Sequence, residues 1–389
     1  VECLRAQVEW VSRSFMGGAR RLAIEGTVSK LGSGESICDS FEGDPFAREL
    51  DYRLAINLTE PAFYSPRNQL TLGAFAERQS EPRIYQRGAQ GVRAALTRQL
   101  GVATAVSATL DVERGRTVTV PAFFCATFLV CEPSDIAALS RLRWKNSLGA
   151  NWGVDRTDRL LDPTSGYTAR AAVAWATPLL GSEIRFLRST VGAAGYRSLR
   201  EAWILAARLE LGTFFGTASL EPGADFLPPD ERFYAGGANS VRGFSRSRLG
   251  PGVYVEEGPV FEPENVTFIP TGGTTLVVTS VELRTPAPFA RDLLRLAWFV
   301  DAGLIERDRL LDIDLRDLRV TPGLGFRFQT PIGPVRLDIA YNGYGTDPGP
   351  LFLTDPETGS LIRVQDRFDP GSGSFLDRIQ LHLAVGNPF

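Results

Sequence analysis

Apolar and polar side chains alternate along segments of about ten residues that recur through almost the whole chain. Within residues 293–305, for example, Trp298 and Val300 lie on one face and Asp301 lies on the other. A period of two is typical of β-strands, whose successive side chains point to opposite sides of the sheet. The sequence therefore predicts an all-β fold with fifteen strands, ten before residue 231 and five after residue 251.

The kind of sheet follows from the polar faces and the connections. A soluble β-sandwich would also alternate, but its polar face lies outside and is rich in Lys. Here Lys is almost absent, the polar positions mix Arg with acids and Gly, and short connections alternate with long ones. These features favour a wide, closed or nearly closed, transmembrane antiparallel β-barrel with a polar lumen, short periplasmic turns and long outer loops.

Composition and charge narrow the class of partner. The chain carries 39 Gly and 25 Pro, which suits many turns, and its net charge is only -3 with basic residues scattered among acidic ones. Nucleic acid is therefore not an expected partner. The longest apolar run, near residues 121–131, is far shorter than the roughly 20 residues of a transmembrane helix. Strands of a barrel are the expected way for this chain to contact a lipid bilayer.

One stretch interrupts the alternation. Residues 231–251 read ERFYAGGANSVRGFSRSRLGP, which is too rich in Gly, Asn and Ser for a strand, and strand-like segments lie on both sides. The motif VRGF comprises Val241, Arg242, Gly243 and Phe244. Two interpretations stand: a loop that places Arg242 inside a barrel, or a solvated loop in which VRGF occurs by chance.

Several pieces in order resemble the barrel domain of the BamA and TamA outer-membrane assembly factors, also called the bacterial surface antigen barrel. FYAGG, VRGF and LGP in 232–251 resemble part of that family's sixth outer loop, called loop six. The other similar pieces are SFMGGARRL at 14–22, TEPAF at 59–63, SVELRTPAPF at 280–289, FVDAG at 299–303 and TPIGPVRLDIAY at 330–341. The resemblance covers nearly the whole chain.

The resemblance implies a sixteen-stranded barrel with eleven strands before loop six and five after it. Since this sequence provides ten before the loop, residues 1–389 are expected to be a barrel domain that lacks the first strand and the periplasmic POTRA domains upstream. The implied location is the bacterial outer membrane. The implied function is folding and insertion of other outer-membrane proteins or autotransporters, with periplasmic or lipoprotein subunits as further partners and no cofactor. A two-partner secretion pore and a passive porin are the alternatives.

The resemblance also implies a role for the loop-six arginine. In the family this Arg enters the lumen and pairs with an acid in the F-x-D-x-G strand, which here is Asp301. Alternation independently places Asp301 on the lumen face, and Glu282 is a second possible partner on the polar face of its own strand. A planar guanidinium suits such a contact because it can hold a carboxylate through two hydrogen bonds. Gly236, Gly237 and Gly243 would let the loop backbone approach the wall.

The remaining candidates are the chain end, the cysteines and the single histidine. Phe389 resembles the C-terminal recognition signal of outer-membrane barrels. Cys125 and Cys131 share one loop, FFCATFLVCEPSD, and we expect disulfides between these two and between Cys3 and Cys38, with free thiols as the alternative. His382 is expected on the polar face of the last strand as a hydrogen-bonding wall residue.

Neither a metal site nor an enzyme is expected. No second Cys or His cluster follows the cysteines at metal-ligand spacing. GxSxG, HExxH and a phosphate-binding Gly loop with Lys are all missing from the sequence. A barrel enzyme that uses His382 with a nearby Ser or acid is the formal alternative.

Overall fold

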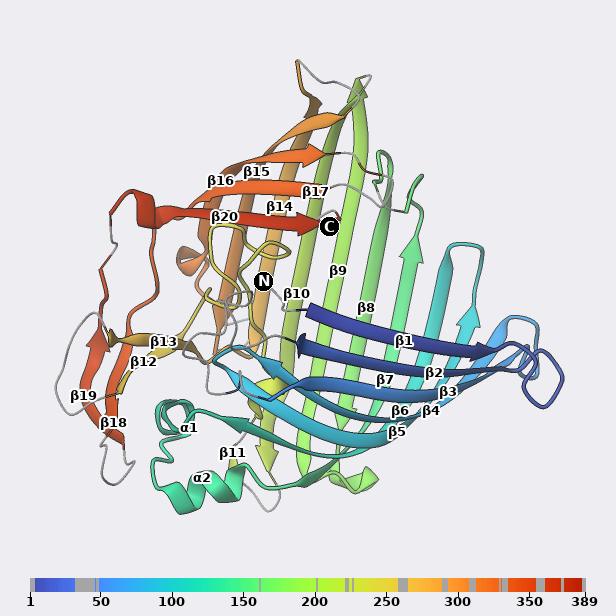
Figure 1. Ribbon diagram of the computed structural model, residues 1–389, viewed down its shortest axis with the longest axis horizontal. Helices are drawn as coiled ribbons and strands as arrows, with labels where there is room; N and C mark the ends of the chain where they lie inside the picture. The colour runs from blue at the N-terminus through green and yellow to red at the C-terminus, as the bar shows by residue number, and fades with distance from the viewer. Residues whose placement is uncertain are drawn as a thin grey trace.

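Figure 1 shows the computed structural model of the protein, in which a curved sheet of long strands surrounds an interior crossed by the connection between β10 and β14. The structure describes residues 4–31, 46, 49–160, 162–200, 202–220, 224–225, 227–257, 265–288, 293–307, 313–328, 330, 335–354, 361–371 and 374–386. The connection from β10 to β14, residues 221–274, is called loop six below.

The main sheet is antiparallel, and fifteen strands follow one another in the order β1 to β10, β14, β15, β16, β17 and β20, with β11 paired to the end of β10. Ten strands precede loop six and five follow it, so the predicted strand order is confirmed. The first ten are β1 (Leu4–Ser12), β2 (Arg21–Leu31), β3 (Asp51–Pro61), β4 (Asn68–Glu81), β5 (Tyr85–Gln99), β6 (Thr104–Thr119), β7 (Arg143–Asp155), β8 (Gly166–Ala176), β9 (Ile184–Arg200) and β10 (Trp203–Leu220). The others are β11 (Ala224–Asp225), β14 (Thr275–Pro286), β15 (Leu294–Glu306), β16 (Arg319–Phe328), β17 (Val335–Tyr341) and β20 (Ile379–Val385).

The outer face of the sheet is apolar. Leu54, Ile56, Leu381 and Leu383 are each more than half exposed, which water would disfavour and lipid accommodates. The six tryptophans, Trp10, Trp144, Trp152, Trp175, Trp203 and Trp298, are also 40 to 54% exposed. Tryptophan is enriched on membrane-protein surfaces near the interface with water. The exterior is therefore that of a membrane-spanning barrel.

A second, smaller sheet caps the outer end of the barrel. It runs in the order β13 (Thr267–Pro270), β12 (Gly252–Glu257), β18 (Gly349–Thr354) and β19 (Leu361–Phe368). β12 and β13 belong to loop six, and β18 and β19 belong to the connection between β17 and β20. Because β12 and β18 pair in parallel, the last outer loop is attached to loop six by backbone hydrogen bonds. The sequence analysis did not predict this sheet.

Two short helices precede β7, and the first of them packs beneath this cap. The stretch that contains Cys125 and Cys131 was expected to be a loop, but it forms α1 (Pro121–Phe128) and leads to α2 (Pro133–Leu139), each with Pro in its first turn. Ala122 and Cys125 of α1 form an apolar cluster with Val253 of β12, Ile269 of β13 and Phe352 of β18. In the part of the chain that the structure describes, no single helix has both the length and the apolar composition to cross a bilayer. Among the described residues there are also four 3₁₀ turns: Pro178–Leu180, Pro229–Glu231 (η3), Leu315–Asp317 and Leu376–Arg378.

The structure contains a disulfide between Cys125 and Cys131. Its expected contribution is to hold the end of α1 against the turn into α2. Replacing both residues by Ser should make residues 120–142 more sensitive to protease, because the crosslink over six residues of separation restricts the unfolded hairpin by about 2 kcal/mol in the chain-entropy model. Limited proteolysis in detergent micelles, with oxidised and reduced wild-type protein as controls, measures this. Equal cleavage of the oxidised protein and the variant would contradict the expected role.

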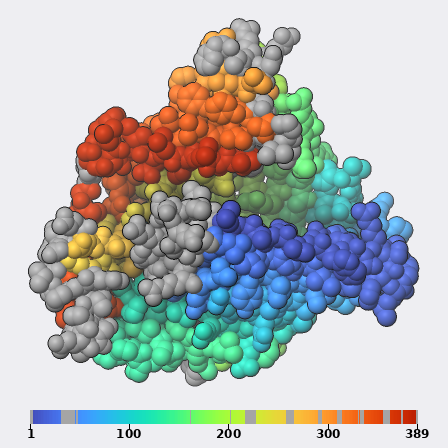
Figure 2. All heavy atoms as spheres, viewed as in Figure 1, coloured from blue at the N-terminus to red at the C-terminus, as the bar shows by residue number. Residues whose placement is uncertain are grey.

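The two ends of the main sheet lie on the same side of the molecule. β1 and β20 both face the viewer in Figure 1, and no ladder pairs them among the described residues. Figure 2 shows an opening between the blue N-terminal strands and the red C-terminal strand, through which the yellow and green interior is visible. Leu4 to Trp10 of β1, which pairs with β2 alone among the described strands, are exposed on both faces. We call the space between β1 and β20 the seam.

Candidate functional site

Loop six folds back into the lumen as a tight hairpin. Ala235 and Leu249 form an isolated bridge, and the Gly237 amide donates to the Phe244 carbonyl at 2.8 Å, so the VRGF motif sits at the end of a tight hairpin. Gly236 and Gly237 have φ angles of 111° and 97°, which side chains other than glycine rarely adopt. The loop can turn here because both positions are glycine.

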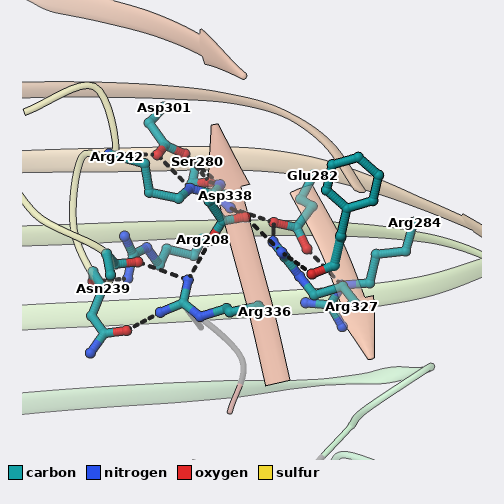
Figure 3. Close-up of polar contacts among 12 residues, drawn as sticks. Arg208, Asn239, Arg242, Ser280, Glu282, Arg284, Asp301, Arg327, Arg336 and Asp338 are labelled. Atoms are coloured by element: carbon teal, nitrogen blue, oxygen red, sulfur yellow. Dashed lines mark hydrogen bonds and ion pairs between the residues drawn. The ribbon is translucent and has the colours of Figure 1, made fainter. Parts of the chain in front are cut away.

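Arg242 reaches the wall formed by β14 and β15 (Figure 3). Its Nε donates to Asp301 Oδ2 at 2.8 Å and its Nη2 donates to Asp301 Oδ1 at 2.8 Å, while its backbone amide donates to Asp301 Oδ2 at 2.9 Å. Ser280 supports the same carboxylate through a hydrogen bond of 2.6 Å to Oδ1. Both Arg242 and Asp301 are almost completely buried, so the pair is shielded from water. The expected contact between these two residues is therefore present.

Glu282 is a second acid on the same guanidinium rather than an alternative to Asp301. Arg242 Nη1 donates to Glu282 Oε2 at 2.7 Å, and Asp338 of β17 lies 3.6 Å from the same nitrogen. Arg327 of β16 joins Glu282 and Asp338, at 3.0 and 2.6 Å. The loop-six arginine thus belongs to an ionic network that spans four neighbouring strands, β14 to β17.

The electrostatics keep Arg242 charged. Burial alone would lower the pKa of its guanidinium. Asp301, through its hydrogen bonds and its charge, outweighs burial with the help of Glu282, so the pKa of Arg242 lies above its ordinary value. The guanidinium carbon also lies 3.3 Å from the centre of the Phe299 ring, whose face attracts cations. Loss of the proton from Arg242 therefore does not make its contact with Asp301 depend on pH.

The other motif residues fit the motif to the wall. Val241 and Phe244 are buried in an apolar cluster that also contains Leu249. Gly243 lies directly against Thr321 of β16: a Cβ atom at this position would come within 2.2 Å of the Thr321 methyl carbon. All four residues of VRGF thus contribute to docking of loop six, two through apolar packing, one through charge and one through the lack of a side chain.

The backbone just before Arg242, at residues 238–240, is held as well. Arg208 of β10 donates to the carbonyls of Asn239 and Ser240 at 2.8 and 2.7 Å, and Arg336 of β17 donates to the Ala238 carbonyl at 2.8 Å. These arginines satisfy carbonyl groups that a buried loop would otherwise leave unpaired. The tip of loop six is therefore held by β10 and by β17.

The last strand contacts the tip of loop six directly. His382 Nε2 lies 2.7 Å from the backbone oxygen of Arg242, and Ser245 and Gln380 share a hydrogen bond of 2.9 Å. His382 is thus a hydrogen-bonding wall residue, and its contact links β20, one edge of the seam, to the VRGF motif.

Several candidates fall elsewhere. Cys3, Cys38 and Phe389 lie outside the described residues, so the proposed Cys3–Cys38 pair and the C-terminal signal stay predictions. Among the residues with described positions, no three His, Cys, Asp or Glu side chains are arranged to hold a metal ion.

Sequence reasoning missed Asp338, Arg327 and Ser280 as members of the site. Alternation does place Asp338 on the polar face of residues 333–342, which was the available signal. What alternation lacks is the register between strands, which brings Asp338 opposite Gly325 and Ser280 opposite Asp301.

Part of the lumen stays open beside this network. A cavity of about 1000 Å³ is lined by the short turns after β5 and β7, by the neighbouring wall and by Asn239 of loop six. Its lining carries both signs of charge, with Asp155, Arg170, Arg208 and Glu210 among the residues. Because Asn239 is part of the lining, the open part of the lumen reaches loop six.

The comparisons with known proteins agree with this architecture. The model of the Omp85 superfamily domain matches residues 15–373. The outer membrane protein assembly factor BamA of Neisseria meningitidis serogroup B is 28% identical over 223 residues, which cover 51% of this chain and 26% of that protein. BamA of Neorickettsia risticii is 22% identical over 341 residues, covering 85% of this chain and 39% of that protein. The chain thus spans less than half the length of these relatives.

A solved structure extends the similarity to the fold. The crystal structure of BamA from Haemophilus ducreyi lacking POTRA domains 1-3 matches with a TM-score of 0.64 at 18% identity, covering 93% of this chain and 68% of that one. The family match extends over most of the chain, and the strand order, the apolar exterior and the loop in the lumen are those expected from the sequence. The chain belongs to the Omp85 superfamily and is a β-barrel of the bacterial outer membrane.

Proposed function

We propose that this chain assists the folding and insertion of other outer-membrane proteins, autotransporters included. The observation that carries the proposal is the seam between β1 and β20 in a barrel whose lumen holds loop six. An unpaired edge strand presents backbone N–H and C=O groups to an incoming strand, which adds by backbone pairing. Lipid thinning beside a short apolar belt would lower the barrier to insertion further.

Substrate strands and the lipid bilayer are the partners that the proposal requires. On the lumen side of the seam, loop six is hydrogen-bonded to Gln380 and His382 of β20. Accessory periplasmic or lipoprotein subunits would deliver unfolded substrates to the periplasmic side of the membrane.

The proposal is tested with the protein reconstituted in lipid vesicles, to which a urea-unfolded outer-membrane barrel protein is added. The expected result is a several-fold faster appearance of folded, protease-resistant substrate than in empty vesicles or in vesicles that contain a passive porin. A folding rate equal to that of the controls would overturn the proposal, and steady ion conductance in the same vesicles would then identify a passive pore.

A further inference from the structure

Loop six has a second charged contact, on the wall opposite the Arg242 network. At the start of the loop, η3 places Asp230 and Glu231 against β5, β6 and β7. Asp230 accepts a hydrogen bond of 2.7 Å from Thr117 and lies 3.1 Å from Arg87 Nε. Glu231 pairs with Lys145, and it lies 3.5 Å from Arg188 of β9. Neither acid takes part in the contacts of VRGF.

The charges of this wall are complementary to η3. Arg53, Arg87, Lys145 and Arg188 supply four positive charges, and the wall acids joined to them, Glu77 and Glu113, supply two negative charges. Arg53 and Arg188 are 41% and 31% exposed, and the other four side chains are less than one-fifth exposed. A partly buried surplus of positive charge is costly unless an acid compensates it. Asp230 and Glu231 provide that compensation from the loop.

A third contact lies on the same half of the barrel. Arg246, just after the VRGF motif, donates from Nε and Nη2 to the two oxygens of Glu81 at 2.9 and 2.8 Å, and Ser247 donates to Glu81 Oε1 at 2.9 Å. Glu81 is the last residue of β4. The loop therefore reaches β4 to β7 on both sides of the motif, while the motif itself holds β14 to β17.

These contacts connect the two halves of the sheet across the lumen. One half of the sheet, β1 to β7, ends with β1 at the seam, and the other half, β14 to β20, ends with β20 there. Figure 1 shows loop six between the two halves. The polarity reverses between the two walls: loop six brings a cation, Arg242, to the acids of β14 to β17, and two acids to the cations of β5 to β9. Loop six thus presents charges of opposite sign to the two walls.

We propose that Asp230 and Glu231 are positioning residues that make loop six a tie between the two walls, and that this tie sets the distance between β1 and β20. The inference concerns regulation of the seam and so rests on the proposed function of that seam. A loop held only by Arg242 would follow the C-terminal half of the barrel and leave the N-terminal half free to move. A loop held at both walls limits that movement.

The test measures the seam without any substrate. Spin labels are attached at Val8 of β1 and Leu383 of β20, which are 72% and 76% exposed, after replacement of both by Cys and of Cys3 and Cys38 by Ser. In the variant with Asp230→Asn and Glu231→Gln we expect a longer and broader distance distribution between the labels. We also expect about tenfold faster amide exchange in residues 233–250, a discounted value because these pairs are not fully buried.

The control is a pair on the same two wall strands that loop six does not use. Arg93 of β5 pairs with Asp111 of β6, and Arg93→Gln with Asp111→Asn should leave the distance and the exchange unchanged. Lys145→Gln removes the wall partner of Glu231. If the two residues interact, the double variant Lys145→Gln with Glu231→Gln should change the distance between the labels by less than the sum of the two single variants. Unchanged distance in the Asp230 and Glu231 variant, or strictly additive effects, would overturn the tie. Since no insertion assay is involved, failure of the proposed function would not produce either result.

Discussion

Replacing Arg242 by Ala should release loop six from β14 to β17 and abolish most of the insertion activity. Removing the guanidinium deletes the two contacts of its fork with Asp301 and leaves Glu282 with one cation fewer in a region that water does not reach. Breaking a buried ion pair by removing one partner costs about 3 to 5 kcal/mol, because the remaining charge stays buried and unpaired. That cost falls on the docked state of the loop, so the loop should undock while the strands stay folded.

The measurement is amide exchange in residues 235–249, together with the folding assay in vesicles. Arg170→Ala is the matched control: Arg170 is another wall arginine, paired with Glu210 at 3.2 Å, but it is 73% exposed. Exposed pairs contribute about 0 to 1 kcal/mol, so this control should behave as the wild type. Arg242→Lys should restore little, since a single ammonium cannot reproduce the planar fork. A variant Arg242→Ala with protected loop amides and full activity would exclude the proposed role of this contact.

The lumen wall was predictable because one physical rule governs it. Side-chain alternation alone places Asp301 on the lumen face, opposite to Trp298 and Val300, and the structure has Asp301 buried and both apolar residues exposed. The same rule applied to fifteen segments yields the strand order, since each antiparallel strand pairs with the next along the chain. Local pattern and global fold agree throughout the barrel.

The outer cap could not be predicted in this way. β12 and β18 pair in parallel through partners such as Tyr254 and Leu351, almost a hundred residues apart, and nothing in either segment identifies the other. The helix α1 is brief, lacks a side-chain cap and is stabilised by burial of Phe123 and Phe124 rather than by its own sequence. Both elements depend on tertiary contacts.

The second contact of loop six was missed for a different reason. The segment PPDE at 228–231 has the composition of a solvated turn, and acids in turns are common. The role of its two acids depends on Arg87 and Lys145, which lie on strands of the wall. Alternation along those strands shows only that Arg87 and Lys145 face the lumen. A sequence can indicate that a charge points inward, but it does not indicate which loop comes to meet it.

Replacing Gly243 by Ala should undock the VRGF motif although no charge is removed. The added Cβ would lie 2.2 Å from Cγ2 and 2.4 Å from Cβ of Thr321, a residue of a β-strand that cannot move aside without disturbing its neighbours. Thr321 pairs in register with Asp301, so the displaced backbone would also move the Arg242 amide away from that carboxylate. Overpacking of a well-packed site costs about 1 to 3 kcal/mol or more.

The double variant Gly243→Ala with Thr321→Gly separates this clash from a general effect of the substitution. It removes the three atoms nearest to the new methyl group, so amide protection of residues 235–249 should recover relative to Gly243→Ala alone, apart from about 1 kcal/mol for a glycine in a strand. Gly195→Ala on β9 is the matched control, because a Cβ there meets nothing within 4 Å and should be tolerated. Recovery in the double variant would show that the docked loop is held by close backbone approach as well as by charge. If the double variant were as poorly protected as Gly243→Ala, the requirement for glycine would lie in the loop backbone itself, and close approach to Thr321 would not be its cause.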